Sequence, residues 1–247
     1  MPLIVRQFPV LSDNYAFVIR DEASGVTACV DTPDAAAILR EVEALGGRLD
    51  FILNTHWHPD HAGGNAQIKA ATGAVVVGPK EVERIAPVDR LVVEGDVVDL
   101  GETRLEVLDT GGHTLQHITY YDAADRIAFV GDTVFALGCG RLFEGTPEQM
   151  WGSLQKIARL PEDTTLYCAH EYTAANARFA LSVDDSAALK ARAAEVFAAR
   201  ERNEPTVPTT VALEKATNPF LRAPVLRPSL APAQAFAEVR RAKDNFS

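Results

Sequence analysis

The 247-residue sequence contains little cysteine, few aromatic residues and no long apolar run. Its three cysteines, Cys29, Cys139 and Cys168, are odd in number, far apart and in no metal-ligand spacing, which argues against a disulfide framework and favours buried, reduced thiols. No apolar run reaches the length of a membrane-spanning helix, and no secretory signal is visible. We therefore expect a globular, cytoplasmic protein with no membrane partner.

Positive charge is also scarce. Lys and Arg total 24 against 34 Asp and Glu, which gives a net charge of −10. Because phosphate contacts demand a dense basic surface, this balance disfavours a nucleic-acid partner. Arg240, Arg241 and Lys243 form a local basic group against this acidic background, and its simplest interpretation is a solvated helix face.

The chain shows no internal repeat, and its first two thirds alternate short β-rich runs with helical patterns. This alternation predicts a mixed α/β domain with sheets covered by helices. Strands are expected at residues 3–8, 15–20, 26–31, 51–54, 74–77, 104–108, 118–121, 126–130 and 165–168. Helices are expected between them at residues 33–45, 62–72 and 147–160.

The residue pattern changes near residue 170, after which alanine-rich helical patterns replace the strand pattern. Helices are expected at residues 173–181, 186–203 and 232–243, with a proline-rich connection before the last. We predict a first domain at residues 1–169 and a smaller helical domain at residues 170–247.

Potential metal ligands are concentrated in residues 54–64, "NTHWHPDHAGG", directly after an apolar run. His56, His58, Asp60 and His61 cannot converge on a regular helix or strand, and Pro59 interrupts both, so a loop leaving a strand end is expected. Imidazole and carboxylate groups bind zinc, iron and manganese alike. Four ligands exceed what one catalytic ion needs, which points to a pair of ions.

Three later residues also follow expected strand ends, namely His113, Asp132 and His170. The interpretation is that His56, His58 and His113 hold one ion, and that Asp60, His61 and His170 hold the second. Asp132 would bridge the two ions through its two oxygens. His117 is expected in the core or as a residue that orients a ligand, while Asp31 and Asp109 are interpreted as strand-end caps.

The motif His56-Trp57-His58-Pro59-Asp60-His61 resembles the HxHxDH signature of the metallo-β-lactamase superfamily. The segments "LSDNYAFVI", "GCGRLFEGT", "HEYTAANARFA", "NPFLR" and "RRAKDNF" resemble the glyoxalase II, or hydroxyacylglutathione hydrolase, family over nearly the full chain. The resemblance implies an αββα sandwich, two mixed sheets flanked by helices, with a small C-terminal helical domain that helps to bind glutathione.

Carried over by matching motif, the resemblance implies that Arg141, Phe143 and Tyr172 lie along the thioester and that Arg240 and Lys243 meet glutathione carboxylates. A positive clamp suits this task, because a chain of net charge −10 repels an anionic thioester. This sequence departs from the family in having Phe143 where tyrosine is common and Arg141 where lysine is common.

The resulting hypothesis is hydrolysis of S-(2-hydroxyacyl)glutathione, typically S-D-lactoylglutathione, to glutathione and D-lactate in methylglyoxal detoxification. Two divalent ions, with zinc favoured over iron or manganese, would activate a water that bridges them. Asp132 and Asp60 are the expected catalytic carboxylates, and Asp60 would act mainly as a ligand to the second ion. The alternatives are an iron-dependent sulfur dioxygenase, a lactonase or β-lactamase of the same fold, and a silent binding protein. The chain is expected to be a monomer or a weak homo-oligomer.

Overall fold

The computed structural model describes residues 3–246, which fall into two compact units. The first unit runs to Asp109 and includes Gln116–Gly131, and the second comprises Thr110–Leu115 and the chain from Asp132 onward. The two units are described separately.

A six-stranded sheet in the order β1-β2-β3-β4-β5-β6 forms one half of the first unit. β1, β2 and β3 pair antiparallel, whereas β3 to β6 pair parallel, so the sheet is mixed. The central strands are buried on both faces, which explains their continuous apolar runs. Its strands are β1 (Leu3–Val10), β2 (Asn14–Asp21), β3 (Thr27–Val30), β4 (Phe51–Leu53), β5 (Val75–Gly78) and β6 (Arg90–Leu91).

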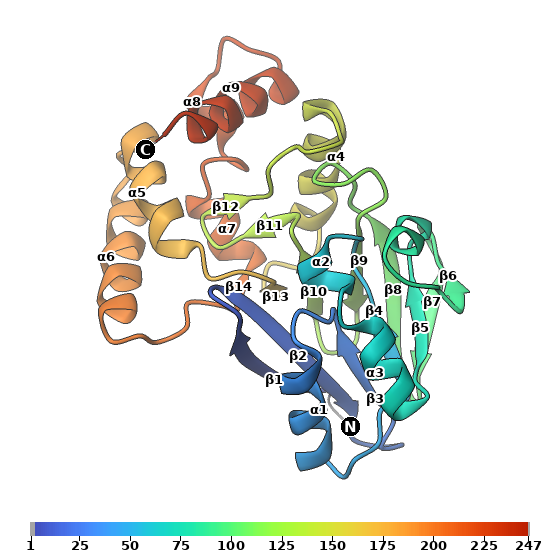
Figure 1. The fold of residues 1–247 in the computed structure, drawn as a ribbon. Helices are drawn as coiled ribbons and strands as arrows, with labels where there is room; N and C mark the ends of the chain where they lie inside the picture. The colour runs from blue at the N-terminus through green and yellow to red at the C-terminus, as the bar shows by residue number, and fades with distance from the viewer. Residues whose placement is uncertain (1–2, 247) are drawn as a thin grey trace. The chain divides into compact units, whose positions relative to one another are not determined.

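Helices α1 (Ala35–Ala44) and α3 (Asn65–Thr72) lie beside this sheet, as Figure 1 shows. Asp34 caps α1 by accepting a hydrogen bond from the Ala37 N–H at 2.9 Å. Ile38 and Val42 of α1 and Ile68 of α3 join one apolar cluster with the buried faces of the strands. Two shorter helical segments follow the strand ends, α2 (Pro59–Ala62) and η1 (Lys80–Arg84).

The other half of the first unit is an antiparallel run of strands in the order β7-β8-β9-β10. β8 alternates buried and exposed residues from Thr103 to Val107, as expected of a strand with one face on the core and one in solvent. The strands are β7 (Val97–Leu100), β8 (Thr103–Asp109), β9 (Ile118–Asp122) and β10 (Ile127–Gly131).

The second unit is mainly helical. α5 and α6 enclose an apolar cluster of Ala177, Ala180, Leu189, Ala193 and Val196 that also takes in Leu137. Its helices are α4 (Pro147–Ala158), α5 (Thr173–Val183), α6 (Ala187–Glu201), α7 (Val211–Thr217), α8 (Ala223–Leu226) and α9 (Pro232–Asp244). Its strands form two short antiparallel pairs, β11 (Val134–Phe135) with β12 (Gly138–Cys139), and β13 (Thr165–Cys168) with β14 (Thr209–Thr210).

The predicted architecture of two mixed sheets flanked by helices, with a helical region toward the C-terminus, is confirmed. All nine predicted strands are present, but β6, β7, β11, β12 and β14 were not predicted, and α7 and α8 lie within the proline-rich connection. The prediction of one helix at residues 62–72 is wrong, because α2 ends at Ala62 and α3 begins at Asn65.

The expectation of buried thiols is met within the described chain. All three cysteines are free and buried, and burial raises the pKa of the Cys139 thiol to about 11 and of the Cys168 thiol to about 12. Among residues 3–246, no helix is long and apolar enough to cross a membrane.

Candidate metal centre

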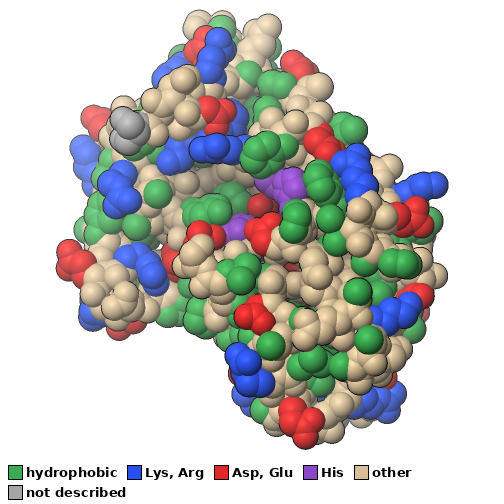
Figure 2. Space-filling model, in the orientation of Figure 1, with side chains coloured by type: hydrophobic (Ala, Val, Ile, Leu, Met, Phe, Trp, Pro, Cys, Tyr) green, Lys and Arg blue, Asp and Glu red, His purple; other side chains and the backbone are tan. Residues whose placement is uncertain are grey.

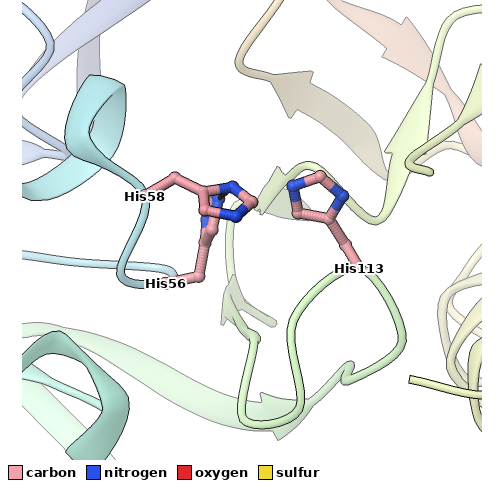
Figure 3. Close-up of side chains that lie close together, drawn as sticks. All are labelled: His56, His58 and His113. Carbon is pink, nitrogen blue, oxygen red and sulfur yellow. Dashed lines mark hydrogen bonds between the residues drawn. The ribbon is translucent and has the colours of Figure 1, made fainter. Parts of the chain in front are cut away.

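The first ligand group leaves the end of β4 and runs into α2. Residues 54–58 form the predicted loop, but Asp60 and His61 lie in α2, not in a loop. Pro59 permits this short helix because the first helical position has no intrahelical partner for an N–H. The His56 Nε2 and His58 Nδ1 atoms approach to 3.0 Å, and Figure 3 shows the two rings extending from this loop.

Asp31, directly after β3, organises the histidines of the first unit. Its carboxylate accepts a hydrogen bond from the Thr55 N–H at 2.8 Å and lies 2.8 Å from both the Thr55 Oγ1 and the His61 Nδ1. The Thr55 hydroxyl is in turn 3.0 Å from the His56 Nδ1. A carboxylate only accepts, so the Nδ1 atoms of His61 and His56 carry protons and their Nε2 lone pairs are open to an ion.

Asp31 was predicted to cap a strand end. Its side chain instead binds Thr55 of the loop and His61 of α2. Asp31 is 4% exposed and has a backbone φ of 57°, a conformation that Asp tolerates better than most residues. Its position directly after a strand was the available signal, since the predicted ligands share it. Asp31, His56 and His61 each have one potential ligand atom within 4.8 Å of those of the other two, which is close enough for the three to hold one metal ion.

Asp60 is accessible to solvent, with its side chain 38% exposed. Its Oδ2 accepts a hydrogen bond from the Asn14 amide at 3.1 Å and lies 3.6 Å from the His61 Nε2. Asp60 and His61 thus present an oxygen and a nitrogen side by side. Asn54 supports the helix that carries them by donating to the His61 carbonyl at 2.9 Å.

The second unit carries three predicted ligands, gathered around one carboxylate. The Asp132 Oδ2 lies 3.3 Å from the His113 Nε2, and its Oδ1 lies 3.4 Å from the His170 Nε2. The His113 Nδ1 donates to the Arg141 carbonyl at 2.8 Å, so its Nε2 lone pair faces Asp132. Figure 3 shows His113 extending from the loop after β8. All three residues are at most 6% exposed.

Gly140 permits this close arrangement. A Cβ atom at Gly140 would lie 2.1 Å from the Asp132 carbonyl and 3.0 Å from the His113 Nδ1. Because real Cβ atoms do not approach so closely, the chain passes the ligand group only with glycine at this position.

Two predicted substrate residues lie against these histidines. The Tyr172 ring stacks on His170 with centroids 4.7 Å apart and planes within 3°, and the Phe143 ring contacts His113 edge to face at 5.3 Å. Tyr172 is 37% exposed and Phe143 is 61% exposed. Each ring therefore lies against a histidine while part of the residue stays exposed.

Arg240 occupies a different environment from the one predicted. It is 5% exposed, its Nη1 donates to the Cys139 carbonyl at 3.0 Å, its Nη2 donates to Asp244 at 2.8 Å, and its guanidinium lies 4.9 Å from the Phe220 ring centroid. These contacts give Arg240 a packing role within the second unit. Contact with a substrate stays a prediction for this residue.

Lys243, one turn further along α9, belongs to a group of cations. Burial and the nearby guanidinium groups of Arg240, Arg141 and Arg178 lower the pKa of Lys243 from its usual value. Arg178 on α5 was not singled out from the sequence. Mutual repulsion in such a group is relieved by an anion, so the arrangement is suited to a carboxylate ligand.

The donor set fits divalent metal ions. The imidazoles of His56, His61 and His113 each present an Nε2 lone pair. The His58 Nδ1 lies 3.0 Å from the His56 Nε2, so both nitrogens are within reach of one cation. Purple histidine side chains are visible from outside in Figure 2, so part of the set is accessible to solvent. His117 is fully buried and stacks on His56 at 4.8 Å, while its role as an orienting residue stays a prediction.

Comparison with known families identifies the class of protein. The model described as "Metallo-beta-lactamase superfamily" matches residues 27–170, and the chain belongs to that superfamily. Residues 171–246 match "Hydroxyacylglutathione hydrolase C-terminus". Within the superfamily, the chain is a member of the hydroxyacylglutathione hydrolase family, whose members are thioester hydrolases.

Curated relatives support this membership over the full length. The hydroxyacylglutathione hydrolases of Erythrobacter litoralis and Maricaulis maris are each 55% identical, over 99% of this chain and 100% and 99% of the relatives. Among solved structures, ETHE1 from Myxococcus xanthus is 25% identical with a TM-score of 0.73, over 99% of this chain and 92% of that one.

The two family matches meet at residues 170 and 171, next to the predicted domain boundary. The compact units of the structure divide the chain elsewhere, at Asp109, Gln116 and Asp132. The domain boundary therefore stays a prediction.

Proposed function

We propose that this protein hydrolyses S-(2-hydroxyacyl)glutathione, with S-D-lactoylglutathione as the typical substrate, at a centre of two divalent ions. The carrying observation is the pair of oriented ligand groups. His56 and His61 are set by Asp31 and Thr55 in one unit, and His113 and His170 face Asp132 in the other. The family model that matches residues 27–170 includes both groups.

We assign one ion to His56, His58 and His113, and the second to Asp60, His61 and His170, with Asp132 shared between them. Ions bound there would lower the pKa of a water molecule and supply hydroxide near neutral pH. The protein's own contribution is to hold the imidazoles of His56, His61 and His113 each in one tautomer, which Thr55, Asp31 and the Arg141 carbonyl accomplish. Asp60 acts as a ligand, and any proton transfer through it is secondary.

The substrate would be positioned by the second unit. Tyr172 and Phe143 each present an exposed ring surface beside a histidine, and Arg141 and Lys243 supply positive charge for the glutathione carboxylates. Because Arg240 is buried, we assign it the weaker share of this binding and Lys243 the stronger. A thiolate leaves readily, so the reaction needs no dedicated general acid.

The finer assignments are also proposals. Zinc is the metal we favour, because nitrogen and carboxylate ligands with constrained geometry suit it, although iron and manganese accept the same donors. We place the protein in the cytoplasm because its three thiols are free. We expect a monomer or a weak homo-oligomer that requires no nucleic acid or membrane.

Purified protein is expected to release thiol from S-D-lactoylglutathione and to contain two divalent ions per chain by elemental analysis. Removal of the metal with a chelator should abolish thiol release, and added zinc should restore it. Oxygen consumption with glutathione persulfide, without thioester hydrolysis, would identify a sulfur dioxygenase and contradict the proposal.

Lys243→Gln is expected to raise KM for the glutathione thioester about fivefold, equivalent to about 1 kcal/mol for an exposed ion pair, with little change in kcat. The change removes one cation from the group while leaving the buried Arg240 contacts intact. Steady-state kinetics with an uncharged thioester of the same acyl group should show no such effect. The matched control is Arg241→Gln, an exposed cation on the same helix. An equal rise in KM for both substrates contradicts the clamp.

A further inference from the structure

The hairpin at residues 134–139, formed by β11 and β12, connects Asp132 to the segment that carries Arg141 and Phe143. Val134 pairs with Cys139 and Phe135 with Gly138, which leaves a two-residue turn. So short a pair of strands has little stability of its own, because an isolated hairpin is marginal in water. Its position must come from other contacts.

Side chains of the helical region bind the backbone of this hairpin. The Leu137 N–H donates to the Glu214 Oε2 at 2.9 Å, and the carbonyls accept from amide or guanidinium groups. The accepting carbonyls and their donors are Phe135 from Asn218 at 3.3 Å, Ala136 from Asn176 at 3.2 Å, Gly138 from Asn218 at 2.9 Å and Cys139 from Arg240 at 3.0 Å. Four side chains thus hold the five consecutive residues 135–139.

Leu137 is the most constrained residue of the hairpin. Its φ of 59° lies in the left-handed region, which costs about 1–2 kcal/mol for a residue with a Cβ atom. The side chain is fully buried in the apolar cluster between α5 and α6, and the N–H is bonded to Glu214. Burial and this hydrogen bond offset the backbone cost and keep the turn in a single conformation.

Glu214 is held by a buried polar network. Its Oε1 accepts from the Arg192 Nη2 and from the Thr209 hydroxyl, both at 2.5 Å, and its Oε2 also accepts from the Asn218 amide at 2.9 Å. Glu214 is fully buried and Arg192 is 7% exposed. A buried ion pair adds little net stability relative to an apolar replacement, and its better-supported use is to specify one arrangement.

The hairpin also contacts the candidate site within the second unit. The Phe135 ring lies edge to face on His170 at 5.8 Å and on Tyr172 at 5.3 Å. Gly140, the next residue after β12, passes against the Asp132 carbonyl and His113. Displacement of the hairpin would therefore move both ligand and substrate residues.

We propose that Glu214, Asn218 and Arg192 are positioning residues that set the hairpin, and through it Asp132, His170, Tyr172 and Arg141. They do not touch the reacting atoms. The proposal rests on the proposed function, since it concerns the geometry of that site. It assigns the helical region a second task besides substrate binding, which is to hold the loop that carries the shared ligand.

Glu214→Gln is the direct test. A glutamine offers only one acceptor oxygen where the carboxylate has two, so at least one of Leu137, Asn218, Arg192 and Thr209 loses its partner. In the metal-loaded enzyme we expect faster amide hydrogen exchange in residues 134–141 and a fall in kcat/KM of about 10- to 100-fold, as for a misplaced site. Asn176→Ala, which removes one carbonyl contact, should give a smaller change of the same kind.

Asp184→Asn is the matched control, because Asp184 pairs with Arg222 at 2.8 Å in the same helical region. Within residues 3–246, the hydrogen bonds that hold the hairpin do not include Asp184. At equal loss of Tm, this variant should keep kcat/KM within about twofold. An equal loss of kcat/KM in both variants overturns the proposal, as does unchanged hairpin exchange in Glu214→Gln. If that variant does not fold, Asn176→Ala decides by the same two readouts.

Failure of the proposed function is distinguishable from failure of this inference. A wild-type protein that releases no thiol from the glutathione thioester contradicts the proposed reaction, whereas hydrogen exchange still reports whether Glu214 holds the hairpin. Faster exchange in Glu214→Gln with unchanged kcat/KM in an active enzyme contradicts the positioning role alone.

Discussion

Asp132→Ala is expected to lower kcat/KM for the glutathione thioester by about 1,000-fold or more, which corresponds to about 4 kcal/mol of lost transition-state stabilisation. The physical reason is the placement of its two oxygens. One lies 3.3 Å from the His113 Nε2 and the other 3.4 Å from the His170 Nε2, so the carboxylate is the group shared by ligands assigned to both ions. Thiol release measures the activity.

Elemental analysis of the same variant should show fewer than two ions per chain after dialysis, because a shared ligand contributes to both sites. Circular dichroism checks that the variant is folded. Asp99→Ala is a suitable control, since that carboxylate belongs to β7 and is 67% exposed. Near-normal hydrolysis by a folded Asp132→Ala variant would refute the two-metal scheme.

Asp31→Asn is expected to weaken metal binding by about 10- to 100-fold, the usual effect of removing an outer-shell hydrogen-bond partner. Asparagine tolerates the φ of 57°, so the backbone is preserved while the chemistry changes. Its amide nitrogen cannot accept from the His61 Nδ1–H or the Thr55 hydroxyl, which leaves one donor facing another. His61 then has no fixed tautomer, and His56 is affected through Thr55.

Competition with a chromophoric chelator measures this affinity independently of activity. The matched control is Asp34→Asn, because the Asp34 side chain caps α1 and asparagine caps as well as aspartate. Full metal affinity in Asp31→Asn would show that Asp31 does not orient the ligands. A lower free energy of unfolding without any change in affinity would restrict Asp31 to a structural role.

Local sequence was sufficient for much of the candidate site. Four potential metal ligands lie within six residues of the sequence, namely His56, His58, Asp60 and His61. The apolar run before them predicts a buried strand, and β4 is that strand. His113, Asp132 and His170 were found because each follows a strand end, and strand ends are readable from apolar patterns. These signals depend on neighbours in the chain, which a sequence displays.

The residues that orient the ligands were less visible. Asp31 contacts His61 across 30 positions of the chain, and Glu214 contacts Leu137 across 77. In the sequence, neither the spacing between the two partners nor the residues around them show that the carboxylate makes this contact. Periodicity records which residues share a face of one element, and it contains no information about which elements meet.

Arg240 and Lys243 show most clearly the difference between what the sequence predicts and what the packing decides. In the sequence, both residues are cations near the end of an amphipathic helix, and the family resemblance implies the same role for both. Folding buries Arg240 under Asp244, Phe220 and the Cys139 carbonyl, and leaves Lys243 part-exposed among other cations. Ligand chemistry, strand positions and the superfamily were thus contained in the sequence. Which carboxylate orients which imidazole, and which of the two cations is buried, followed from tertiary packing, because both depend on contacts between segments distant in the chain.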